Sequence, residues 1–299
     1  MRTELTADFV WQNITPRARN SHKGSFGAVL AVAGSACYRG AAALTVEGAL
    51  RCGAGIVTLA SVESVLAAVS ARLPECCLCP CEAGAEGGIS PDSLPKIACQ
   101  KATTLLLGPG LGGTAQSAAR ALESRTLVQR LLSGFAGDAV LDADGLNAAA
   151  QIMAAGQALP HPSGELILTP HPGEMARLTG LSAAQINADR EGTAIRFASQ
   201  WNAVVVLKGA GTVIAAPDGR YVVNSTGNPG LSRGGSGDVL AGMTAALLAC
   251  GLPAFEAACC AVWLHGTAAD RAAALHGEYG MLPQDLFPEL GRLFAQQGR

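Results

Sequence analysis

A glycine-rich loop that leads directly into an apolar helix is the part of this chain best suited to chemistry. Residues 228–242 read NPGLSRGGSGDVLAG. Glycine lets successive backbone N–H groups turn toward one point, and the start of a helix adds a partial positive charge. This combination is typical of an anion hole that binds a phosphate, here formed by Gly234, Gly235, Ser236 and Gly237.

Asp238 follows this loop at the entrance of the helix. A carboxylate beside a bound phosphate is repelled, so its presence there suggests a chemical task. The obvious task is to take a proton from a hydroxyl that attacks the phosphorus. The alternative is that Asp238 merely caps the helix, as Asp often does. The glycines around it are more than a cap requires, which favours the phosphate site.

Composition excludes several classes of partner. The net charge is −2 and only 4% of the residues are aromatic, so neither a nucleic-acid surface nor a membrane surface is indicated. Apolar residues make up 49% of the chain, enough for a parallel sheet covered on both faces. Recognition of a phosphate must therefore come from the backbone and from local charges.

The first 20 residues are polar and show no secretory signal, and no apolar run is long enough to span a bilayer. We therefore expect a cytoplasmic protein whose ten cysteines are reduced. Cys76, Cys77, Cys79 and Cys81 form a cluster that contains a C-x-x-C. A zinc site is one interpretation, but no second pair follows at the spacing of a zinc finger. The favoured interpretation is that these cysteines are small core side chains in a short strand.

Short apolar strands alternate with helical segments along almost the whole chain. Both faces of these strands are apolar, which is typical of a buried parallel sheet. Strand–helix–strand repetition predicts a doubly wound α/β fold with helices on both faces. The expected strands are 28–33, 56–60, 75–80, 103–107, 138–141, 166–169 and 203–207, and the expected helices are 40–52, 62–72, 116–132, 143–154, 173–178 and 183–200.

The pattern changes after residue 211. Segments 212–216 and 220–224 flank Pro217-Asp218-Gly219, a turn signature that predicts a small antiparallel hairpin. Two long helices, 235–250 and 253–275, are expected to follow. No linker, low-complexity tract or repeat divides the chain. We expect a single domain over residues 1–299, with 1–20 as an N-terminal extension.

Polar residues and glycines follow five of the expected strands. Each group alone is ordinary turn chemistry, but ligands of open α/β sheets bind beyond the carboxyl ends of the strands. Repetition at successive strand ends therefore favours one shared site. Asp142, Asp144 and Glu174 in these groups are candidates for holding Mg²⁺, directly or through water. Capping of helices is the alternative, mainly for Asp142 or Asp144.

Three basic or imidazole side chains have different interpretations. His171 lies between two prolines, a rigid placement that favours contact with a ligand. Lys208 begins the sequence KGAGT, which favours a nucleotide contact over a mere strand end. His265 lies in an apolar helical segment and is interpreted as a core histidine rather than a catalyst. The chain lacks the P-loop, G-x-G-x-x-G and G-x-S-x-G motifs, which disfavours the enzymes that use them.

Taken in order, these segments resemble those of the ADP-dependent NAD(P)H-hydrate dehydratases, members of the ribokinase-like superfamily. Six ordered motifs are far more specific than any one of them. The motifs are residues 22–27, 108–112, 142–147, 169–175, 208–212 and 227–242.

The resemblance implies a ribokinase-like fold and a repair reaction. The substrate would be the S-epimer of NADH-hydrate or NADPH-hydrate, dehydrated at the expense of ADP or ATP with Mg²⁺. The enzyme would phosphorylate the ring hydroxyl, with Asp238 as the base, and phosphate would then leave. A homotetramer is implied as well. Because few residues precede the first motif, we expect a dehydratase without the epimerase domain that many relatives carry, acting beside a separate epimerase.

The resemblance also implies roles for individual residues. The departure from the family pattern is Ser232-Arg233, where a small residue followed by Thr or Ser is expected. Contacts to the hydrate are implied for Ala41 or Ala42, Gly110 or Gly112, His171 and Asp238, and contacts to the adenine nucleotide for Lys208, Gly209, Ala210, Gly211, Thr212 and Gly237.

Two rival functions remain open. A kinase of a small vitamin-like alcohol, of the hydroxymethylpyrimidine or pyridoxal type, would use the same base and anion hole with ATP. It would release a stable phosphorylated product. A catalytically silent nucleotide sensor is the second rival, and the intact carboxylate of Asp238 argues against it.

Overall fold

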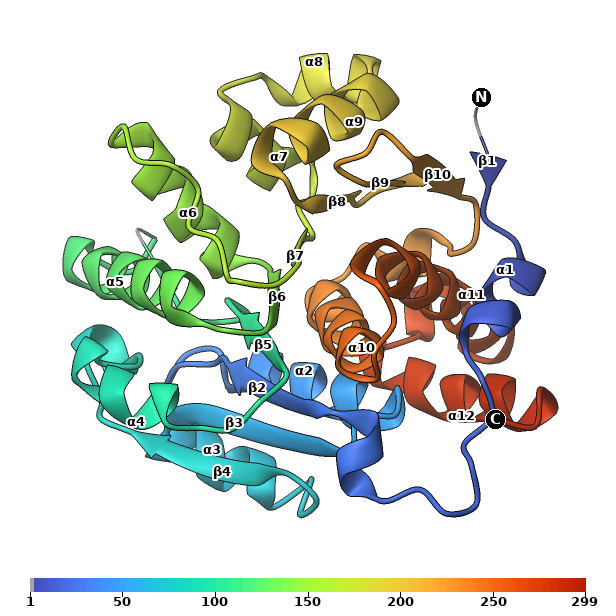
Figure 1. Cartoon of the computed structure of the whole chain (residues 1–299), viewed down its shortest axis with the longest axis horizontal. Helices are drawn as coiled ribbons and strands as arrows, with labels where there is room; N and C mark the ends of the chain where they lie inside the picture. The colour runs from blue at the N-terminus through green and yellow to red at the C-terminus, as the bar shows by residue number, and fades with distance from the viewer. Residues whose placement is uncertain (1–2, 114) are drawn as a thin grey trace.

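A single mixed sheet runs through the whole molecule. The computed structural model describes residues 3–113 and 115–299, and the first two residues of the expected N-terminal extension lie outside them. Ten strands lie in the order β1-β10-β9-β8-β7-β6-β5-β2-β3-β4 (Figure 1). The strands are β1 Thr3–Glu4, β2 Ala28–Val32, β3 Ile56–Val62, β4 Cys77–Cys81, β5 Thr104–Leu107, β6 Asp138–Leu141, β7 Leu166–Leu168, β8 Val204–Leu207, β9 Thr212–Ala215 and β10 Tyr221–Asn224.

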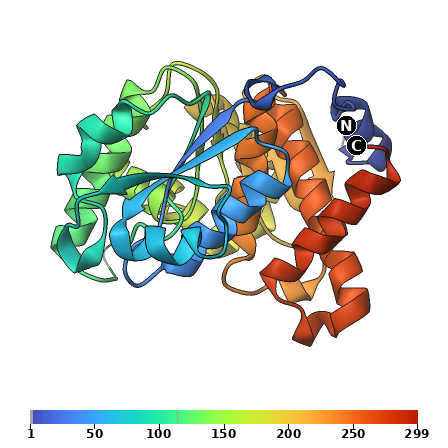
Figure 2. The ribbon, with the colours of Figure 1, turned by 90° about the horizontal axis from the view of Figure 1, so that it is seen from below.

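Helices cover both faces of this sheet. The orange and red helices at the C-terminal end of the chain lie on the opposite side of the molecule from the green α5 and α6 (Figure 2). The helices are α1 Ala7–Asn13, α2 Arg39–Arg51, α3 Glu63–Ser70, α4 Leu94–Ala98, α5 Ala118–Gly134, α6 Asp144–Ala154, α7 Pro172–Thr179, α8 Ala183–Ala188, α9 Arg190–Trp201, α10 Ser236–Ala249, α11 Ala254–Gly280 and α12 Leu286–Gln296.

The pairing of the strands confirms the expected fold class. Strands β2 to β8 pair only in parallel with one another. Strand β9 is antiparallel to both β8 and β10, which is the expected hairpin. All four residues of β5 and of β8 are buried, because helices pack on both faces. Their apolar composition follows from that burial.

Two glycines let α10 lie unusually close to α2. A Cβ atom on Gly242 would lie 2.1 Å from the backbone oxygen of Thr45, and one on Gly48 would lie 2.7 Å from that of Val239. Any larger residue at either position would push the helices apart. The backbones therefore approach each other directly, which fixes where α10 begins relative to α2.

The described part of the N-terminal segment contacts the sheet and the C-terminal helices. Strand β1 pairs in parallel with β10, so it forms the edge of the sheet. Helix α1 packs on α11 through Trp11 and Trp263, whose rings meet edge to face with centroids 5.9 Å apart. The guanidinium of Arg299 donates to the carbonyls of Trp11 and Ile14, which joins α1 to the last residue of the chain.

Some expected boundaries were wrong. The single helix expected over 183–200 is two helices, α8 and α9, because the Asp189 side chain caps α9 by accepting from the N–H of Gly192 at 2.9 Å. The strand expected over 75–80 begins only at Cys77. In that strand Cys79 and Cys81 are buried in the core, while Cys77 is exposed. Helices α1, α4 and α12 were not expected. Among the described residues, no helix is long and apolar enough to cross a membrane.

Candidate active site

A cavity of about 730 Å³ collects most of the residues that the sequence assigned to one site. Its walls come from the ends of β6, β7, β8 and β10 and from the start of α10. This is the carboxyl edge of the parallel strands, where ligands of open α/β sheets bind. The lining includes Asp142, His171 and segments 208–212, 224–229 and 231–238.

The start of α10 leaves backbone N–H groups beside this cavity. Gly235 is the N-cap and has a φ of 99°, a conformation that favours glycine. Because glycine has no side chain to cap the helix, the N–H groups of the first turn have no partner from the cap residue. Gly234, Ser236 and Gly237 complete the loop and line the cavity. The arrangement is the expected one for an anion hole.

Asp238 lies in the first turn of α10, three residues after the cap. It is therefore not the N-cap residue, and the capping interpretation does not account for it. The pKa of Asp238 is raised to about 7, first by burial and then by the charge of Asp142, with Lys208 opposing both. A carboxylate with a pKa near neutrality is well matched to accepting a proton at physiological pH.

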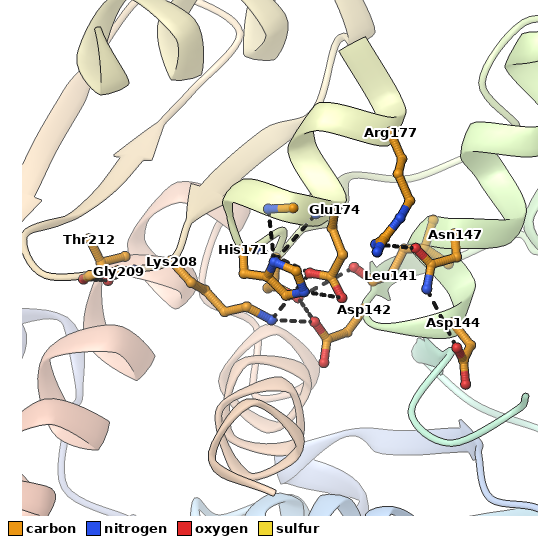
Figure 3. A network of polar contacts seen from close by, with 12 residues as sticks. Leu141, Asp142, Asp144, Asn147, His171, Glu174, Arg177, Lys208, Gly209 and Thr212 are labelled. Atoms are coloured by element: carbon orange, nitrogen blue, oxygen red, sulfur yellow. Dashed lines mark hydrogen bonds and ion pairs between the residues drawn. The ribbon is translucent and has the colours of Figure 1, made fainter. Parts of the chain in front are cut away.

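Lys208 follows β8 and points toward two carboxylates. Its Nζ atom lies 2.8 Å from Oδ1 of Asp142 and 3.8 Å from Oε2 of Glu174 (Figure 3). Burial by itself lowers the pKa of Lys208, but the two carboxylates outweigh it and the pKa is raised. Thr169 donates its hydroxyl to the same oxygen of Asp142 at 2.6 Å. Asp142 is 1% exposed, so its charge depends on these partners.

His171 and Glu174 fix the start of α7. Nδ1 of His171 accepts from the N–H of Gly173 at 2.9 Å, and Oε2 of Glu174 accepts from the N–H of His171 at 2.8 Å. This reciprocal capping box requires Nδ1 of His171 to be unprotonated. Burial raises the pKa of Glu174 to about 7, with Lys208 opposing it. Burial lowers the pKa of His171, and the charge of Lys208 lowers it further. His171 borders the cavity in a neutral form.

The expected nucleotide-binding loop, residues 208–212, lines the same cavity. Thr212 and Gly209 close it with hydrogen bonds from the hydroxyl of Thr212 to the carbonyl of Gly209 and from the N–H of Gly209 to that hydroxyl. Arg190 supports it from α9 by donating to the carbonyls of Leu207 and Lys208. The sequence analysis did not identify Arg190, and an arginine at a helix start gives no signal of such a role.

His265 is a structural residue at the back of the cavity. Its Nε2 lies 3.0 Å from the carbonyl oxygen of Ser236, and the side chain is buried. Burial lowers its pKa to about 4, so the ring is neutral and donates from Nε2. His265 therefore holds the first turn of α10, in agreement with the core-histidine interpretation. Arg233 instead donates to the carbonyl of Tyr279 at 2.8 Å.

One wall of the cavity was predicted only in part, because the motif 227–242 includes Gly227 and Asn228 but not the three residues before them. Residues 224–228, from the end of β10 onward, line the cavity. Asp270 of α11 holds this segment by accepting from the N–H of Gly227 at 2.9 Å and from the amide of Asn228 at 3.0 Å. The signal was available, since 224–228 reads NSTGN, a polar run directly after a strand.

The residues implied for the hydrate lie at different depths. Ala42 is completely buried, whereas Ala41 is half-buried. Ala41 lies beside Gly110, where a Cβ atom would come within 2.9 Å of the Ala41 methyl group. Gly112 donates its N–H to Oδ2 of Asp144 at 2.8 Å. Ala41 is therefore better placed than Ala42 to meet a ligand, and the choice between Gly110 and Gly112 stays a prediction.

Asp142 and Asp144 face two different cavities. The large cavity is lined by Asp142, and a second cavity of about 410 Å³ is lined by Asp144 and Gly112. Ala143 between them has a φ of 50° and a ψ of −120°, a conformation that costs a non-glycine residue energy. This strained residue directs the neighbouring carboxylates to opposite sides (Figure 3).

The three candidate magnesium ligands do not meet directly. Asp142 and Glu174 lie on either side of the Lys208 ammonium, and Asp144 is bonded to Gly112. Within residues 3–113 and 115–299, no group of three or more His, Cys, Asp or Glu side chains is arranged to hold a metal. Binding of Mg²⁺ through water and substrate phosphates stays a prediction.

Comparison with known proteins identifies the family of the chain. Residues 29–292 match the family model described as NAD(P)H-hydrate dehydratase. The chain is 42% identical over 255 residues to the ADP-dependent (S)-NAD(P)H-hydrate dehydratase of Neisseria meningitidis serogroup B, covering 85% of this chain and 80% of that one. It is 41% identical over 287 residues to the bifunctional NAD(P)H-hydrate repair enzyme of Moorella thermoacetica, covering 95% of this chain and 52% of that one.

Solved structures agree in fold. The ADP/ATP-dependent NAD(P)H-hydrate dehydratase of Bacillus subtilis, co-crystallised with ATP and Mg²⁺, has a TM-score of 0.83 at 32% identity and covers 99% of both chains. A ribokinase-like superfamily protein of Enterococcus faecalis has the same TM-score at 28% identity, covering 99% of this chain and 96% of that one. Several of the curated relatives, including the Moorella enzyme, are about twice as long as the part that this chain matches. By the extent of these matches, the chain belongs to the NAD(P)H-hydrate dehydratase family.

Proposed function

We propose that this protein dehydrates the S-epimer of NADH-hydrate or NADPH-hydrate and uses the terminal phosphoryl group of ADP to do so. The observation that carries the proposal is Asp238, a half-buried carboxylate with a pKa raised to about 7 beside an uncapped helix start. The activity of the Neisseria relative, which carries this reaction in its name, supports the choice of substrate. Nicotinamide repair is thus the reaction for which the site is best suited.

Hydroxide is a poor leaving group, so the first step activates the ring hydroxyl. Asp238 takes the hydroxyl proton while the oxygen attacks the terminal phosphorus of ADP, and the bond to AMP breaks. Backbone N–H groups at Gly235–Gly237 stabilise the charge on the transferred phosphoryl group. Lys208 lies close enough to this edge to neutralise a nucleotide phosphate.

The second step expels phosphate. The lone pair of the ring nitrogen pushes out the phosphate ester, and a proton leaves the neighbouring carbon, which restores the double bond of NADH or NADPH. AMP and phosphate are the other products, so atoms balance without an oxidant. Mg²⁺, where it takes part, would accompany the nucleotide phosphates. The Bacillus relative was co-crystallised with ATP and Mg²⁺.

An absorbance assay tests the proposal. Purified protein is mixed with hydrated NADH or NADPH, and the return of reduced-nicotinamide absorbance is followed with ADP, with ATP and with neither. Recovery that requires ADP supports the proposal. Recovery only with ATP would show that ATP, and not ADP, is the phosphoryl donor. If neither nucleotide gives recovery from protein that binds both, the dehydratase proposal is wrong. A kinase of a vitamin-like alcohol, tested by release of a phosphorylated product, is then the better function.

A further inference from the structure

The second cavity has features of a subsite for an extended, anionic ligand. It has a volume of about 410 Å³ and is lined by residues from α2, the loop after β5, α6 and α7. Gly112 in its wall belongs to the 108–112 loop that the family resemblance connects with the hydrate. Asp144 in the same wall is two residues from Asp142 of the large cavity. The two cavities therefore lie on either side of one short segment.

Arg177 gives this cavity an available positive charge. Among the described residues that line it, Arg177 is the only cation. Its Nη1 donates to Oδ1 of Asn147 at 2.9 Å, a neutral amide (Figure 3), and its charge also acts on the carboxyl group of Glu174. Asp144, the one carboxylate in the lining, is directed elsewhere, to the N–H of Gly112 and the amide of Asn147. A guanidinium in this state is suited to contact a phosphate.

Two further side chains point to the same kind of ligand. Gln116 lines the cavity, and its Nε2 is buried without a hydrogen-bond partner in the part of the chain that the structure describes. A buried donor without a partner costs free energy that a bound oxygen would recover. The ring of Tyr38 is 45% exposed at the rim, where it offers a face on which a base can stack.

We propose that this second cavity binds the phosphate-bearing remainder of the dinucleotide substrate, with Arg177 contacting a phosphate and setting the affinity for the full dinucleotide. The inference rests on the proposed function, in which the nicotinamide ring lies near Asp238 and the adenine nucleotide occupies the Lys208 loop. The rest of the dinucleotide then has to leave the large cavity past Ala143 and Asp144. Its diphosphate then comes within reach of Arg177.

Kinetics with two substrates test this assignment. Arg177→Gln is compared with wild type on hydrated NADH and on hydrated reduced nicotinamide riboside, which lacks the diphosphate and the adenosine. We expect the KM for hydrated NADH to rise about tenfold or more, because charged hydrogen bonds of this kind are that strong. The kcat and the KM for ADP should change less than about twofold. Arg177→Lys should recover part of the loss.

The matched control is Arg196→Gln on α9. Arg196 is also an exposed helical arginine, but it stacks on Phe197 and lines neither cavity. An equal rise in KM for Arg196→Gln would attribute the effect to net charge and would overturn the proposal. So would an unchanged KM for Arg177→Gln, or an equal rise with the truncated substrate, since that substrate is too short to span both cavities.

A binding measurement separates this inference from the proposed function. Titration calorimetry with NAD⁺, which carries the same diphosphate as hydrated NADH but no ring hydroxyl, needs no turnover. We expect the Kd to rise about tenfold in Arg177→Gln and to stay unchanged in Arg196→Gln. An Arg177-dependent Kd in a protein that dehydrates no hydrate would retain the subsite and reject the reaction. Turnover together with a Kd that does not depend on Arg177 would retain the reaction and reject the subsite.

Discussion

The Nζ atom of Lys208 lies 2.8 Å from Oδ1 of Asp142, which joins the residue after β8 to the residue after β6 across the end of β7. Asp142 is 1% exposed, and Glu174 is within 3.8 Å of the same ammonium. Two carboxylates at this depth would repel each other strongly without a cation between them. The ammonium therefore allows three neighbouring strand ends to carry polar groups toward one cavity.

Lys208→Met should separate the structural role of this ion pair from its catalytic role. The variant leaves Asp142 buried without its cation, and we expect it to lose about 3–5 kcal/mol of unfolding free energy. Lys208→Met combined with Asp142→Asn removes both charges and should recover most of that loss, but not the ADP-dependent turnover. Urea denaturation and the absorbance assay measure the two effects. Full recovery of turnover in the double variant would show that Lys208 has no part in the reaction.

The pH dependence of turnover should report Asp238. A base must be ionised, and burial raises the pKa of Asp238 to about 7. We therefore expect kcat/KM to fall tenfold per pH unit below about pH 7 and to level off above it. Glu174→Gln removes a neighbouring charge that contributes to the raised pKa, so it should shift this limb to lower pH. A limb that disappears in Glu174→Gln would instead identify Glu174 as the titrating group.

Asp238→Asn should abolish turnover and yet stabilise the protein. The folded pKa of about 7 is above the unfolded value of 3.8, so folding takes up a proton between those values and wild-type stability falls as pH rises through them. The penalty is complete above about pH 7. The Asn variant avoids it, and we expect a gain of about 1–3 kcal/mol at pH 8 and almost none at pH 4. Thermal unfolding at both values measures the gain, and calorimetry with ADP checks that binding remains. A pH-independent difference would contradict the raised pKa.

Ala143→Gly should be a stabilising substitution. Ala143 has a φ of 50° and a ψ of −120°, which glycine adopts without strain. Relief of about 1–3 kcal/mol of strain exceeds the cost of about 1 kcal/mol that glycine adds by loosening the unfolded chain. Ala155→Gly, at an ordinary φ of −81°, is the matched control and should destabilise. Equal losses in urea denaturation for the two variants would rule out strain at Ala143.

The sequence predicted the sheet better than the site. Apolar strands and a Pro-Asp-Gly turn are local signals, so β2 to β10 and the hairpin could be found from the order of residues. Strand β1 has only two residues, and α4 only five, too short for a hydrophobic period to show. The division of α8 from α9 at Asp189 depends on a cap that could have been noticed, since Ser182 and Asp189 are both residues that cap helices.

The contacts within the site could not be predicted in the same way. Asp142 and Lys208 are separated by 66 positions, and only the order of the strands in the sheet brings them together. Asp142, Asp144 and Glu174 were predicted as candidates for holding Mg²⁺, directly or through water, because all lie in polar groups that follow strands. The backbone conformation of Ala143 turns the Asp144 side chain away from that of Asp142. A strained backbone of this kind cannot be recognised from the residue type. The hydrogen bond from Arg177 to Asn147 joins α7 to α6, and it could not be predicted from the sequence either.

The glycine contact between α2 and α10 limits how this protein can move. Ala41 lies in the first turn of α2 and Asp238 in the first turn of α10, and Gly48 and Gly242 lock the two helices backbone against backbone. Sliding one helix along the other would break that fit, so Ala41 and Asp238 keep a fixed position relative to each other whatever ligand the cavity takes.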